Sequence, residues 1–456
     1  MKIKIGLFLV IFTSMLNAQI PNQISVEDKI FGLSKFWQEV NYNFVYLDKV
    51  NKDEWDNLYK SLITEVQNTP NDYEYYKVLQ KFCAHLKDGH TNVFFPSIIQ
   101  DSILNTNFGT YRLFLSNIDD KAIITKVNAS KKEELPIGTE IVKVNGIPTS
   151  EHIEENVLPY ISSSTEHILQ DLSVSKMLED WVGTSYELEL KLPNGKIKSL
   201  NLTHGTTKEK ELYPPSETRL LEFKWVKKDM AYIGMNSFSD WEIMDLFMEK
   251  LPEILKAKKL IIDLRNNGGG NTNIGREIIK YLTNDTILYG SKSQSRLHIP
   301  TYKAWGKWIQ EKDTVNNYWS KQGYLSYRDR FYHDFPYDPY PTMNLDISRI
   351  EVPTAILIGH NTASAAEDFL IFADNQEHMV KIGEPTFGST GQPMLFAMPN
   401  GGSARVCTKK DTYPDGREFV GFGIQPDIEV KKTILNFLNN EDPVLTRAIE
   451  FLQKDN

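Results

Sequence analysis

The stretch that decides the fold is Val352–Thr390, VPTAILIGHNTASAAEDFLIFADNQEHMVKIGEPTFGST. It opens with a short apolar run, rich in β-branched side chains, that ends at Gly359 and predicts a buried strand. A short polar turn follows, and apolar residues then recur at helical spacing within 365–373. Ser364 therefore lies where a predicted strand leads into a predicted helix.

This position allows two interpretations of Ser364. The start of a helix has unpaired backbone N–H groups and the positive end of the helix dipole. A serine there can attack a carbonyl carbon while nearby N–H groups hold the oxyanion that forms. Ser364 and Glu367 also have the S-x-x-E spacing of a capping box. Taken alone, this spacing favours the cap, so other parts of the chain must decide.

The first 18 residues, MKIKIGLFLVIFTSMLNA, combine two lysines, an apolar stretch and a small residue at Ala18. This pattern predicts a signal peptide, residues 1–18, cleaved after Ala18, and hence an exported protein that is periplasmic or secreted. A membrane anchor is the alternative, but the apolar stretch is shorter than the roughly 20 residues that a span requires. No other segment is long and apolar enough to span a bilayer, so stable membrane insertion is not expected.

The chain is acidic, with a formal net charge of −9 over 456 residues. Removal of Lys2 and Lys4 with the signal peptide would change this charge to −11. An acidic chain without a basic stretch is a poor nucleic-acid binder. Two cysteines, Cys83 and Cys407, cannot form a disulfide framework. A single disulfide between them is possible in an exported protein, but two buried thiols are favoured.

The length favours two or three domains. Residues 19–100 carry apolar side chains at helical spacing and predict a small helical domain. His90 follows the last of these helices, in the segment Asp88-Gly89-His90-Thr91 just before a short strand-like run. Considered alone, a loop histidine is more often a solvated side chain than a functional one.

Residues 101–210 contain short strands separated by turns, which predicts a small β-rich domain. Within it, Leu135–Gly146 has the pattern P-x-G-x-x-I-x-x-V-N-G, which resembles a PDZ domain. The resemblance implies that Phe108, Gly109 and Tyr111 lie near a loop that receives a peptide's C-terminal carboxylate. PDZ domains bind a peptide by adding it as a strand. A β-rich domain without a ligand is the alternative.

Residues 211–456 begin with a strand, helix, strand, glycine turn and helix, which predicts a partly parallel sheet. The glycine turn is Asn266–Asn271, and its three successive glycines let the backbone approach a ligand and expose N–H groups. No G-K-[ST] and no G-x-G-x-x-G is present, so a nucleotide-binding loop is not predicted. The aromatic-rich insertion 287–348 suggests little regular structure and either a lid, a binding surface or a packed decoration.

Four motifs occur in one order: DLRNNGGG at Asp263–Gly270, SAAE at Ser364–Glu367, GEPTFG at Gly383–Gly388 and GIQPD at Gly423–Asp427. With them the chain, over roughly residues 25–450, resembles the C-terminal-processing and tricorn-like serine proteases. The resemblance implies an α/β multidomain fold. Its parts are an N-terminal helical domain, a PDZ-like domain and a Clp/crotonase-like catalytic core with Ser364 as nucleophile.

The resemblance also bears on the general base. The processing branch uses a lysine in a T-F-G-K motif, but here the position, 25 residues after Ser364, is Ser389. The tricorn-like branch uses an N-terminal histidine assisted by a late glutamate. The segment around His90 resembles that histidine motif, and Glu418 is the expected acidic partner. A neutral histidine within hydrogen-bond reach can deprotonate the serine and protonate the leaving amine.

The oxyanion is expected to be held by the N–H of Ala365 and by that of Gly268 or Gly269. Glu367 is expected to act as a helix cap rather than as a catalyst. No H-E-x-x-H and no paired cysteine set is present, so neither a metal nor another cofactor is predicted.

The sequence thus predicts an exported serine-type peptidase that hydrolyses peptides or unfolded proteins, with the PDZ-like domain guiding a substrate C-terminus. Two alternatives remain. One is an inactive peptide-binding protein on the same scaffold, which the serine in place of lysine keeps open. The other is an esterase or acyl-transfer enzyme, because crotonase relatives use a similar oxyanion hole.

Overall fold

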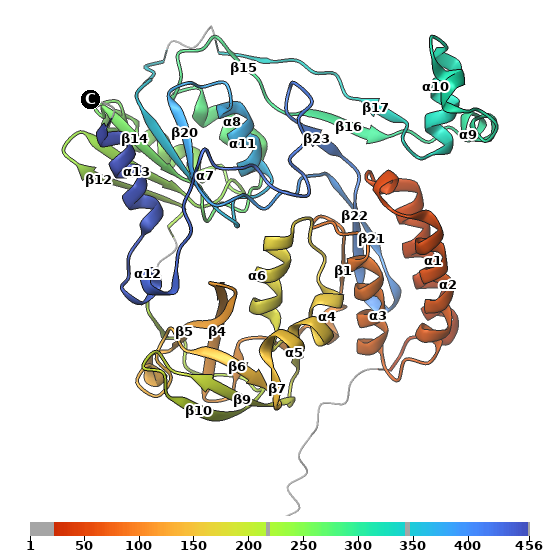
Figure 1. Ribbon diagram of the computed structural model, residues 1–456, viewed down its shortest axis with the longest axis horizontal. Coiled ribbons are helices and arrows are strands. Elements are labelled where there is room, and N and C mark those ends of the chain that lie inside the picture. The colour runs from red at the N-terminus through yellow and green to blue at the C-terminus, as the bar shows by residue number, and fades with distance from the viewer. Residues whose placement is uncertain (1–21, 216–218, 343–346, 455–456) are drawn as a thin grey trace, which may run out of the picture.

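The computed structural model describes residues 22–215, 219–342 and 347–454 (Figure 1). The predicted signal peptide, residues 1–18, lies outside the described residues. In the part of the chain that is described, no helix has the length and hydrophobicity needed to cross a bilayer. Cys83 and Cys407 are buried free thiols, as the sequence favoured.

The N-terminal part consists of three α-helices, a short 3-10 helix and a short strand, which lie at the right of Figure 1. Each α-helix begins at a residue, Ser25, Asn51 or Asn71, whose side chain accepts a backbone N–H three positions on. Such N-caps satisfy donors that the helix leaves unpaired. The elements are α1 (Val26–Asn43), η1 (Leu47–Lys49), α2 (Lys52–Gln67), α3 (Asp72–Ala84) and β1 (Asn92–Phe94).

The middle part is built on an eight-stranded sheet with the order β10-β9-β6-β5-β4-β3, in which β7 pairs with β6 and β11 pairs with β5. Its elements are α4 (Ser97–Gln100), β2 (Ile103–Leu104), β3 (Asn107–Phe108), β4 (Tyr111–Ile118), β5 (Lys121–Asn128), η2 (Ala129–Lys131), β6 (Glu140–Val144), β7 (Ile147–Pro148), α5 (Thr149–Asn156), η3 (Leu158–Tyr160), α6 (Glu166–Lys176), β8 (Asp180–Trp181), β9 (Ser185–Lys191), β10 (Ile197–Thr203) and β11 (Leu212–Tyr213). Its buried apolar residues form a core of their own.

The third part contains a six-stranded sheet with the order β12-β13-β14-β19-β20-β24. Only β12 pairs antiparallel; the other neighbours are parallel, which confirms the predicted partly parallel sheet. The strands are β12 (Leu221–Lys227), β13 (Met230–Met235), β14 (Lys259–Asp263), β19 (Thr354–Ile358), β20 (Met379–Gly383) and β24 (Ile428–Glu429). The helices are α7 (Glu242–Ile254), α8 (Thr272–Ile279), α11 (Ala365–Ala373), α12 (Ile434–Leu438) and α13 (Pro443–Lys454).

Helices cover both faces of this sheet. Alternate residues of β14 point to opposite sides, so Ile262 packs with α7, α8 and α11, whereas Ile261 packs with α13. Strands buried on both faces read as continuous apolar runs, which is how β14 and β19 stand out in the sequence. The carboxyl ends of the parallel strands therefore meet along one edge, where α11 begins.

A second, three-stranded sheet joins the two ends of the chain. β1 pairs antiparallel with β22 (Ser403–Cys407), which also pairs with β21 (Pro393–Ala397). Asn92 lies opposite Arg405 in this pairing. The buried residues of α1–α3 belong to the same apolar cluster as those of α7, α8 and α11. The N-terminal helices thus pack continuously with the third part of the molecule, and the segment after α3 is held against it.

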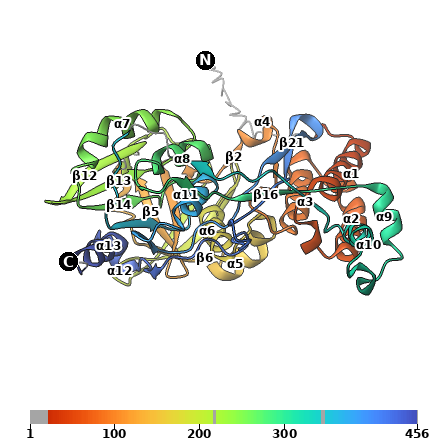
Figure 2. The ribbon, with the colours of Figure 1, turned by 90° about the horizontal axis from the view of Figure 1, so that it is seen from above.

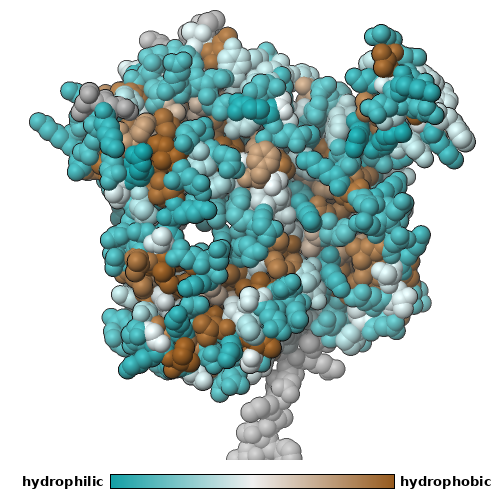
Figure 3. Space-filling view, viewed as in Figure 1, coloured by the Kyte–Doolittle hydropathy of each residue, from teal (hydrophilic) through white to brown (hydrophobic). Residues whose placement is uncertain are grey.

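The insertion between α8 and β19 contains more regular structure than the sequence suggested. It holds β15 (Ile287–Leu288), β16 (Lys292–Arg296), α9 (Pro300–Gly306), η4 (Glu311–Thr314), α10 (Tyr318–Tyr327), β17 (Tyr332–Asp334) and β18 (Tyr340–Pro341). The pairing of β16 with β17 and β23 (Lys410–Thr412) carries α9 and α10 out as a protruding knob (Figures 1 and 2). The prediction of little regular structure was wrong here. The rings of Trp305 in α9 and Trp319 in α10 pack the two short helices together, with their centroids 5.1 Å apart. The knob stands clear of a mainly hydrophilic face (Figure 3).

Candidate active site

Ser364 occupies a strained turn between β19 and α11. Its backbone has φ 55° and ψ −118°, a conformation that a residue with a side chain rarely adopts. The turn is held from below by Thr362, whose hydroxyl accepts the Gly359 N–H at 3.1 Å and donates to the Leu264 carbonyl at 2.9 Å. Strain of this kind persists only where the surroundings fix it, and it is concentrated at functional sites.

Glu367 is fully buried and fixes this turn. One carboxylate oxygen accepts the Ser364 N–H at 2.9 Å, which is the cap contact that the sequence predicted. The other accepts the Thr386 hydroxyl at 2.5 Å and the Gly388 N–H at 2.8 Å. Burial raises the pKa of Glu367 to about 7, although these hydrogen bonds lower it. Glu367 therefore links the Ser364 turn to the segment that leads to Ser389.

Ser364 and His90 line the same cavity, whose volume is about 450 Å³. Four separate segments of the chain contribute to its wall, and they come from the N-terminal part, the glycine turn, the start of α11 and the 386–405 region. The lining residues are Gly89, His90, Asn266, Gly268, Asn361, Ala363, Ser364, Phe387 and Arg405. The fold thus brings together a histidine and a serine that are far apart in the sequence.

His90 is presented by a short loop that β1 anchors. The Gly89 N–H donates to the Ser164 hydroxyl at 2.9 Å, and the Thr91 hydroxyl accepts the Cys407 N–H at 3.0 Å. Because β1 pairs with β22, this loop is attached to the third part of the molecule rather than left as a solvated end. Because the loop is anchored in this way, His90 is not a solvated residue on a free loop.

The hydrogen-bond partner of the His90 ring is Ser389. Ser389 is buried, and its Oγ lies 2.6 Å from His90 Nδ1. Burial, followed by the positive charge of Arg405, lowers the pKa of His90 to about 4. The ring is therefore neutral near pH 7, and with Nδ1 engaged by Ser389, Nε2 is the nitrogen left for a second partner. Sequence reasoning treated Ser389 only as a missing lysine.

The glycine turn lies against the start of α11. The Ala363 N–H donates to the Asn267 carbonyl at 3.0 Å, and the Asn267 side chain donates to the Met235 carbonyl at 3.0 Å. Gly269 has φ 93°, and a Cβ there would lie 2.8 Å from both the Ala365 nitrogen and the Ser364 Cβ. Only glycine fits this contact, so the turn and the Ser364 backbone are packed directly on each other.

Two of the three predicted oxyanion donors have a free N–H. Those of Gly268 and Ala365 donate to no atom of the described residues, and Gly268 lines the cavity. The N–H of Gly269, in contrast, donates to the Asn267 side chain at 3.0 Å. This bond removes Gly269 from the set of oxyanion donors, and its part is the close packing described above.

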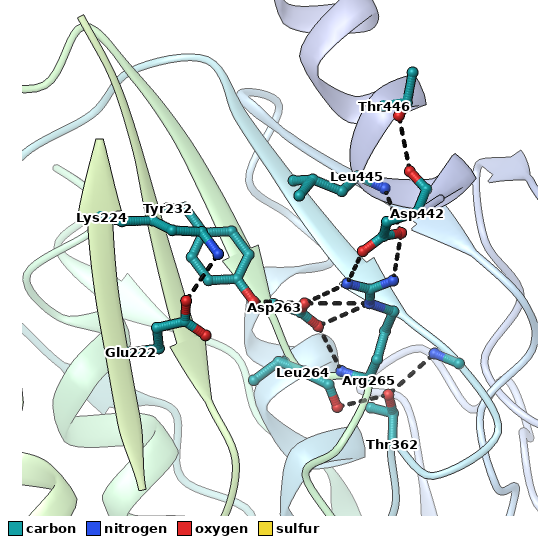
Figure 4. A network of polar contacts seen from close by, with 11 residues as sticks. Glu222, Lys224, Tyr232, Asp263, Leu264, Arg265, Thr362, Asp442, Leu445 and Thr446 are labelled. Atoms are coloured by element: carbon teal, nitrogen blue, oxygen red, sulfur yellow. Dashed lines mark hydrogen bonds and ion pairs between the residues drawn. The ribbon is translucent and has the colours of Figure 1, made fainter. Parts of the chain in front are cut away.

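A polar network below the site ties the glycine turn to the C-terminal helix (Figure 4). Arg265 donates to Asp263 and, through both Nη atoms at 2.8 Å, to Asp442 at the start of α13. The Tyr232 hydroxyl donates to Asp263 at 2.8 Å. Charge-assisted bidentate bonds of this type hold geometry well. The charged residues of the DLRNNGGG motif, Asp263 and Arg265, therefore support the glycine turn and do not line the cavity.

The structure does not bring Glu418 to His90. The Glu418 carboxylate forms ion pairs with Lys410 and with Lys49, and it does not line the cavity. These two lysines satisfy it and lower its pKa. The expectation that Glu418 orients His90 therefore has no geometric support, since Ser389 holds the ring nitrogen in question.

The three residues expected to receive a peptide carboxylate lie in the middle part, away from the cavity wall. Phe108 is buried and stacks on His204 with ring centroids 4.3 Å apart. The Gly109 N–H donates to the Gly205 carbonyl at 3.0 Å, and the Tyr111 hydroxyl donates to Glu134 at 2.7 Å. The N–H of Gly109 is thus already engaged in the present conformation.

Comparison with known proteins gives a family match over part of the chain. Residues 229–430 match the family model described as Peptidase family S41. These residues, somewhat less than half of the chain, are similar to an S41 peptidase domain. The predicted resemblance to C-terminal-processing proteases is thereby confirmed, and the matched residues include the glycine turn, Ser364, Glu367 and Ser389.

Curated relatives are more distant. A carboxyl-terminal-processing protease from Picosynechococcus sp. is 23% identical over 280 residues, covering 60% of this chain and 56% of that protein. Another from Synechocystis sp. is 25% identical over 188 residues, with 41% and 34% covered. The chloroplastic carboxyl-terminal-processing peptidase 2 of Arabidopsis thaliana is 21% identical over 94% of this chain and 74% of its own length. The chain thus spans about half, or a third, of the length of the first two relatives.

Solved structures show the shared fold. A structure of mature CPAF complexed with lactacystin superposes with a TM-score of 0.64 at 14% identity, covering 94% of this chain and 97% of that one. A putative peptidase from Parabacteroides merdae gives a TM-score of 0.50 at 18% identity, with 94% and 97% covered. At such identities the likeness establishes the mixed α/β architecture across nearly the whole chain.

Proposed function

We propose that the chain is a serine-type peptidase in which Ser364 is the nucleophile and His90 is the general base. The observation that carries this proposal is the position of both side chains on one cavity, with His90 Nδ1 engaged by Ser389. Peptides or unfolded protein chains are the substrate class that the family domain favours. The proposal covers the described residues and needs no metal or cofactor.

The reaction follows from these positions. The neutral His90 takes the Ser364 proton through Nε2 as the hydroxyl attacks the scissile carbonyl carbon, and the resulting imidazolium protonates the leaving amine. In the second half of the reaction, His90 takes a proton from the water that attacks the acyl-enzyme and returns it to the Ser364 oxygen as the acyl group leaves. A base whose ring is neutral over the working pH range suits both steps.

The developing oxyanion is assigned to the free N–H groups of Gly268 and Ala365. Gly268 lines the cavity, and Ala365 immediately follows the nucleophile at the start of α11. The positive end of the α11 dipole adds to their effect. Preorganised donors of this kind stabilise the transition state by about 2.7–4 kcal/mol each.

Ser389 is expected to position His90 rather than to act on the substrate. Ser389→Ala removes the hydroxyl 2.6 Å from Nδ1, so the ring loses its tautomer control. We expect kcat/KM to fall about five- to tenfold, the effect of one hydrogen bond of roughly 1–1.4 kcal/mol. Kinetics on a peptide substrate would measure it. Thr390→Val, which removes the neighbouring buried hydroxyl bonded to Asp411, is the control; equal losses in both variants would contradict the role.

The pH dependence of kcat/KM should report the low pKa of His90. Protonation removes the base, and burial with Arg405 lowers the pKa of His90 to about 4, so activity on an uncharged peptide should stay level down to about pH 5 and fall below it. Protonation of Glu367 should not interrupt this plateau, because a protonated carboxyl group keeps an oxygen that can accept the Ser364 N–H. A midpoint above pH 6 would contradict the assignment of a buried neutral His90.

The middle part is proposed to be a PDZ-like domain, residues 101–210, that guides a substrate C-terminus. Its Leu135–Gly146 pattern and its antiparallel sheet flanked by α5 and α6 support this. The other proposed parts of the chain are a signal peptide, residues 1–18, that directs export, an N-terminal helical domain, residues 19–100, and a catalytic domain, residues 211–456. Localisation in the periplasm or outside the cell follows from that signal segment.

Turnover separates peptidase from the two alternatives. The chain from residue 19 would be incubated with an unfolded, reduced protein and with matched ester and amide substrates, alongside Ser364→Ala. Cleavage of the protein that is lost in Ser364→Ala supports the peptidase. Hydrolysis of the ester alone would replace it with an esterase. No turnover of either substrate by a folded wild type would leave the peptide-binding protein as the better account.

A further inference from the structure

Of the described residues that line the Ser364 cavity, only Arg405 carries a charge near pH 7, because the His90 ring is neutral there. It lies on β22, opposite Asn92 of β1, two residues after His90. Its Nε donates to the Asn92 side chain at 2.8 Å, and its guanidinium carbon lies 5.5 Å from the Phe94 ring centroid. These two contacts fix the guanidinium plane from behind.

The front of this guanidinium group has no partner in the described part of the chain. No carboxylate there lies within 4.0 Å of Arg405, and neither Nη atom donates a hydrogen bond. The contrast with Arg265, which binds Asp263 and Asp442 together, is plain. Arg417 likewise binds two carboxylates, those of Asp374 and Asp415.

Two acidic groups act electrostatically on this part of the cavity: Asp88 on Arg405 and Asp411 on His90. Both already have other hydrogen-bond or ion-pair partners. Asp88 is buried, accepts the Thr91 hydroxyl at 2.6 Å and lies near the Ser164 hydroxyl at 3.4 Å. Asp411 is held by Ser293, Thr390 and Lys409. The Arg405 guanidinium is half-buried, and removing an unpaired charge from water is unfavourable unless a counter-charge meets it.

We propose that Arg405 receives a carboxylate of the substrate, so that the peptidase prefers peptides that carry a carboxylate close to the scissile bond. The inference rests on the proposed function, because it concerns the cavity of Ser364 and His90. A guanidinium fixed through Nε presents its two Nη atoms as a fork, which matches a carboxylate with two parallel hydrogen bonds. Among the described residues, the rest of the cavity wall, with Asn266, Asn361 and Phe387, supplies no competing negative charge.

The carboxylate has two sources with the same chemistry. It belongs either to a Glu or Asp side chain of the substrate or to the α-carboxylate at the C-terminus of a peptide. The second source would make Arg405 a reader of chain ends within the cavity itself. The experiment therefore varies the side chain and the chain end independently.

Binding can be measured without turnover in the Ser364→Ala background. Fluorescein-labelled short peptides of Ala, Gly and Ser would carry one Glu or one Gln scanned along the chain, with the C-terminus either free or amidated. Anisotropy would give Kd for Ser364→Ala and for Ser364→Ala with Arg405→Gln. We expect at least one carboxylate peptide to bind about tenfold more tightly than its amide partner, and the ratio to fall below about threefold without Arg405.

The outcomes assign the source or overturn the proposal. A Glu/Gln ratio lost with Arg405→Gln assigns the site to acidic side chains, and a free/amidated ratio lost in the same way assigns it to chain ends. Arg405→Lys keeps the charge but not the fork, so a folded Lys variant should retain part of the ratio if Arg405→Gln does not fold. Equal binding of all acid and amide pairs, or a ratio that survives Arg405→Gln, would overturn the proposal.

The same peptides tested for cleavage by the wild type keep the two hypotheses apart. Cleavage of neutral and acidic peptides at equal rates would contradict the carboxylate preference and leave the peptidase intact. Carboxylate-selective binding without cleavage of any peptide would contradict the peptidase and leave the Arg405 site intact.

Discussion

Ser364→Ala is expected to lower kcat/KM on a peptide substrate by at least about ten-thousandfold, because loss of a nucleophilic serine removes the covalent pathway altogether. Little change in stability is expected, since the Glu367 carboxylate, which the substitution leaves in place, accepts the Ser364 backbone N–H. Peptide cleavage and thermal unfolding, measured on the same preparations, would check both parts of this expectation.

Ser25→Ala is the matched control, because Ser25 is the N-cap of α1 and its hydroxyl accepts the Asp28 N–H at 3.1 Å. Loss of this cap should lower the free energy of unfolding by about 1 kcal/mol with no effect on kcat/KM. If Ser364→Ala behaved in the same way as Ser25→Ala, with reduced stability and full activity, Ser364 would be only a cap and the proposed mechanism would fail.

The second large effect is expected for His90→Ala. A general base contributes about 10²–10⁴-fold, so kcat/KM should fall about a thousandfold or more while KM changes little. Added imidazole should restore part of the activity, because the vacated space opens onto the cavity of Ser364. Steady-state kinetics with and without imidazole would measure the loss and its rescue.

His85→Ala provides the control for His90, because His85 lies five positions earlier and does not line the Ser364 cavity. The His85 ring stacks on that of Trp55, with the ring centroids 6.2 Å apart. Removal of the His85 side chain therefore affects packing rather than the cavity. Equal loss of activity in the two variants, or no loss in His90→Ala, would mean that a different group deprotonates Ser364.

The elements that the sequence predicts well are those whose signal is local. β13, β14 and β19 are continuous apolar runs, and α1–α3 have clear apolar periodicity with side-chain caps, so both kinds follow from neighbouring residues. The position of Ser364 between a strand and a helix follows in the same way from a strand, a short polar turn and a helix start. The position of His90 came from the family resemblance, because no local pattern reveals that β1 pairs with β22.

The parts that sequence reasoning missed depend on contacts between distant segments. Ser389 meets His90 across 299 positions, and Arg405 reaches the cavity only through the β1–β22 pairing. Glu418 was chosen from its place near the end of the chain, but Lys49 and Lys410 hold it. Gly269 shares its sequence context with Gly268, and only the Asn267 side chain distinguishes their N–H groups.

The central claim is that His90 activates Ser364 without a lysine, and covalent labelling tests it most directly. The chain from residue 19 would react with a fluorophosphonate, and peptide mass spectrometry would locate the modified residue in wild type, Ser364→Ala and His90→Ala. The account predicts rapid labelling at Ser364 in the wild type, none in Ser364→Ala and labelling slowed about a hundredfold or more in His90→Ala. Labelling of Ser364 at the wild-type rate in His90→Ala, or no labelling of a folded wild type, would contradict it.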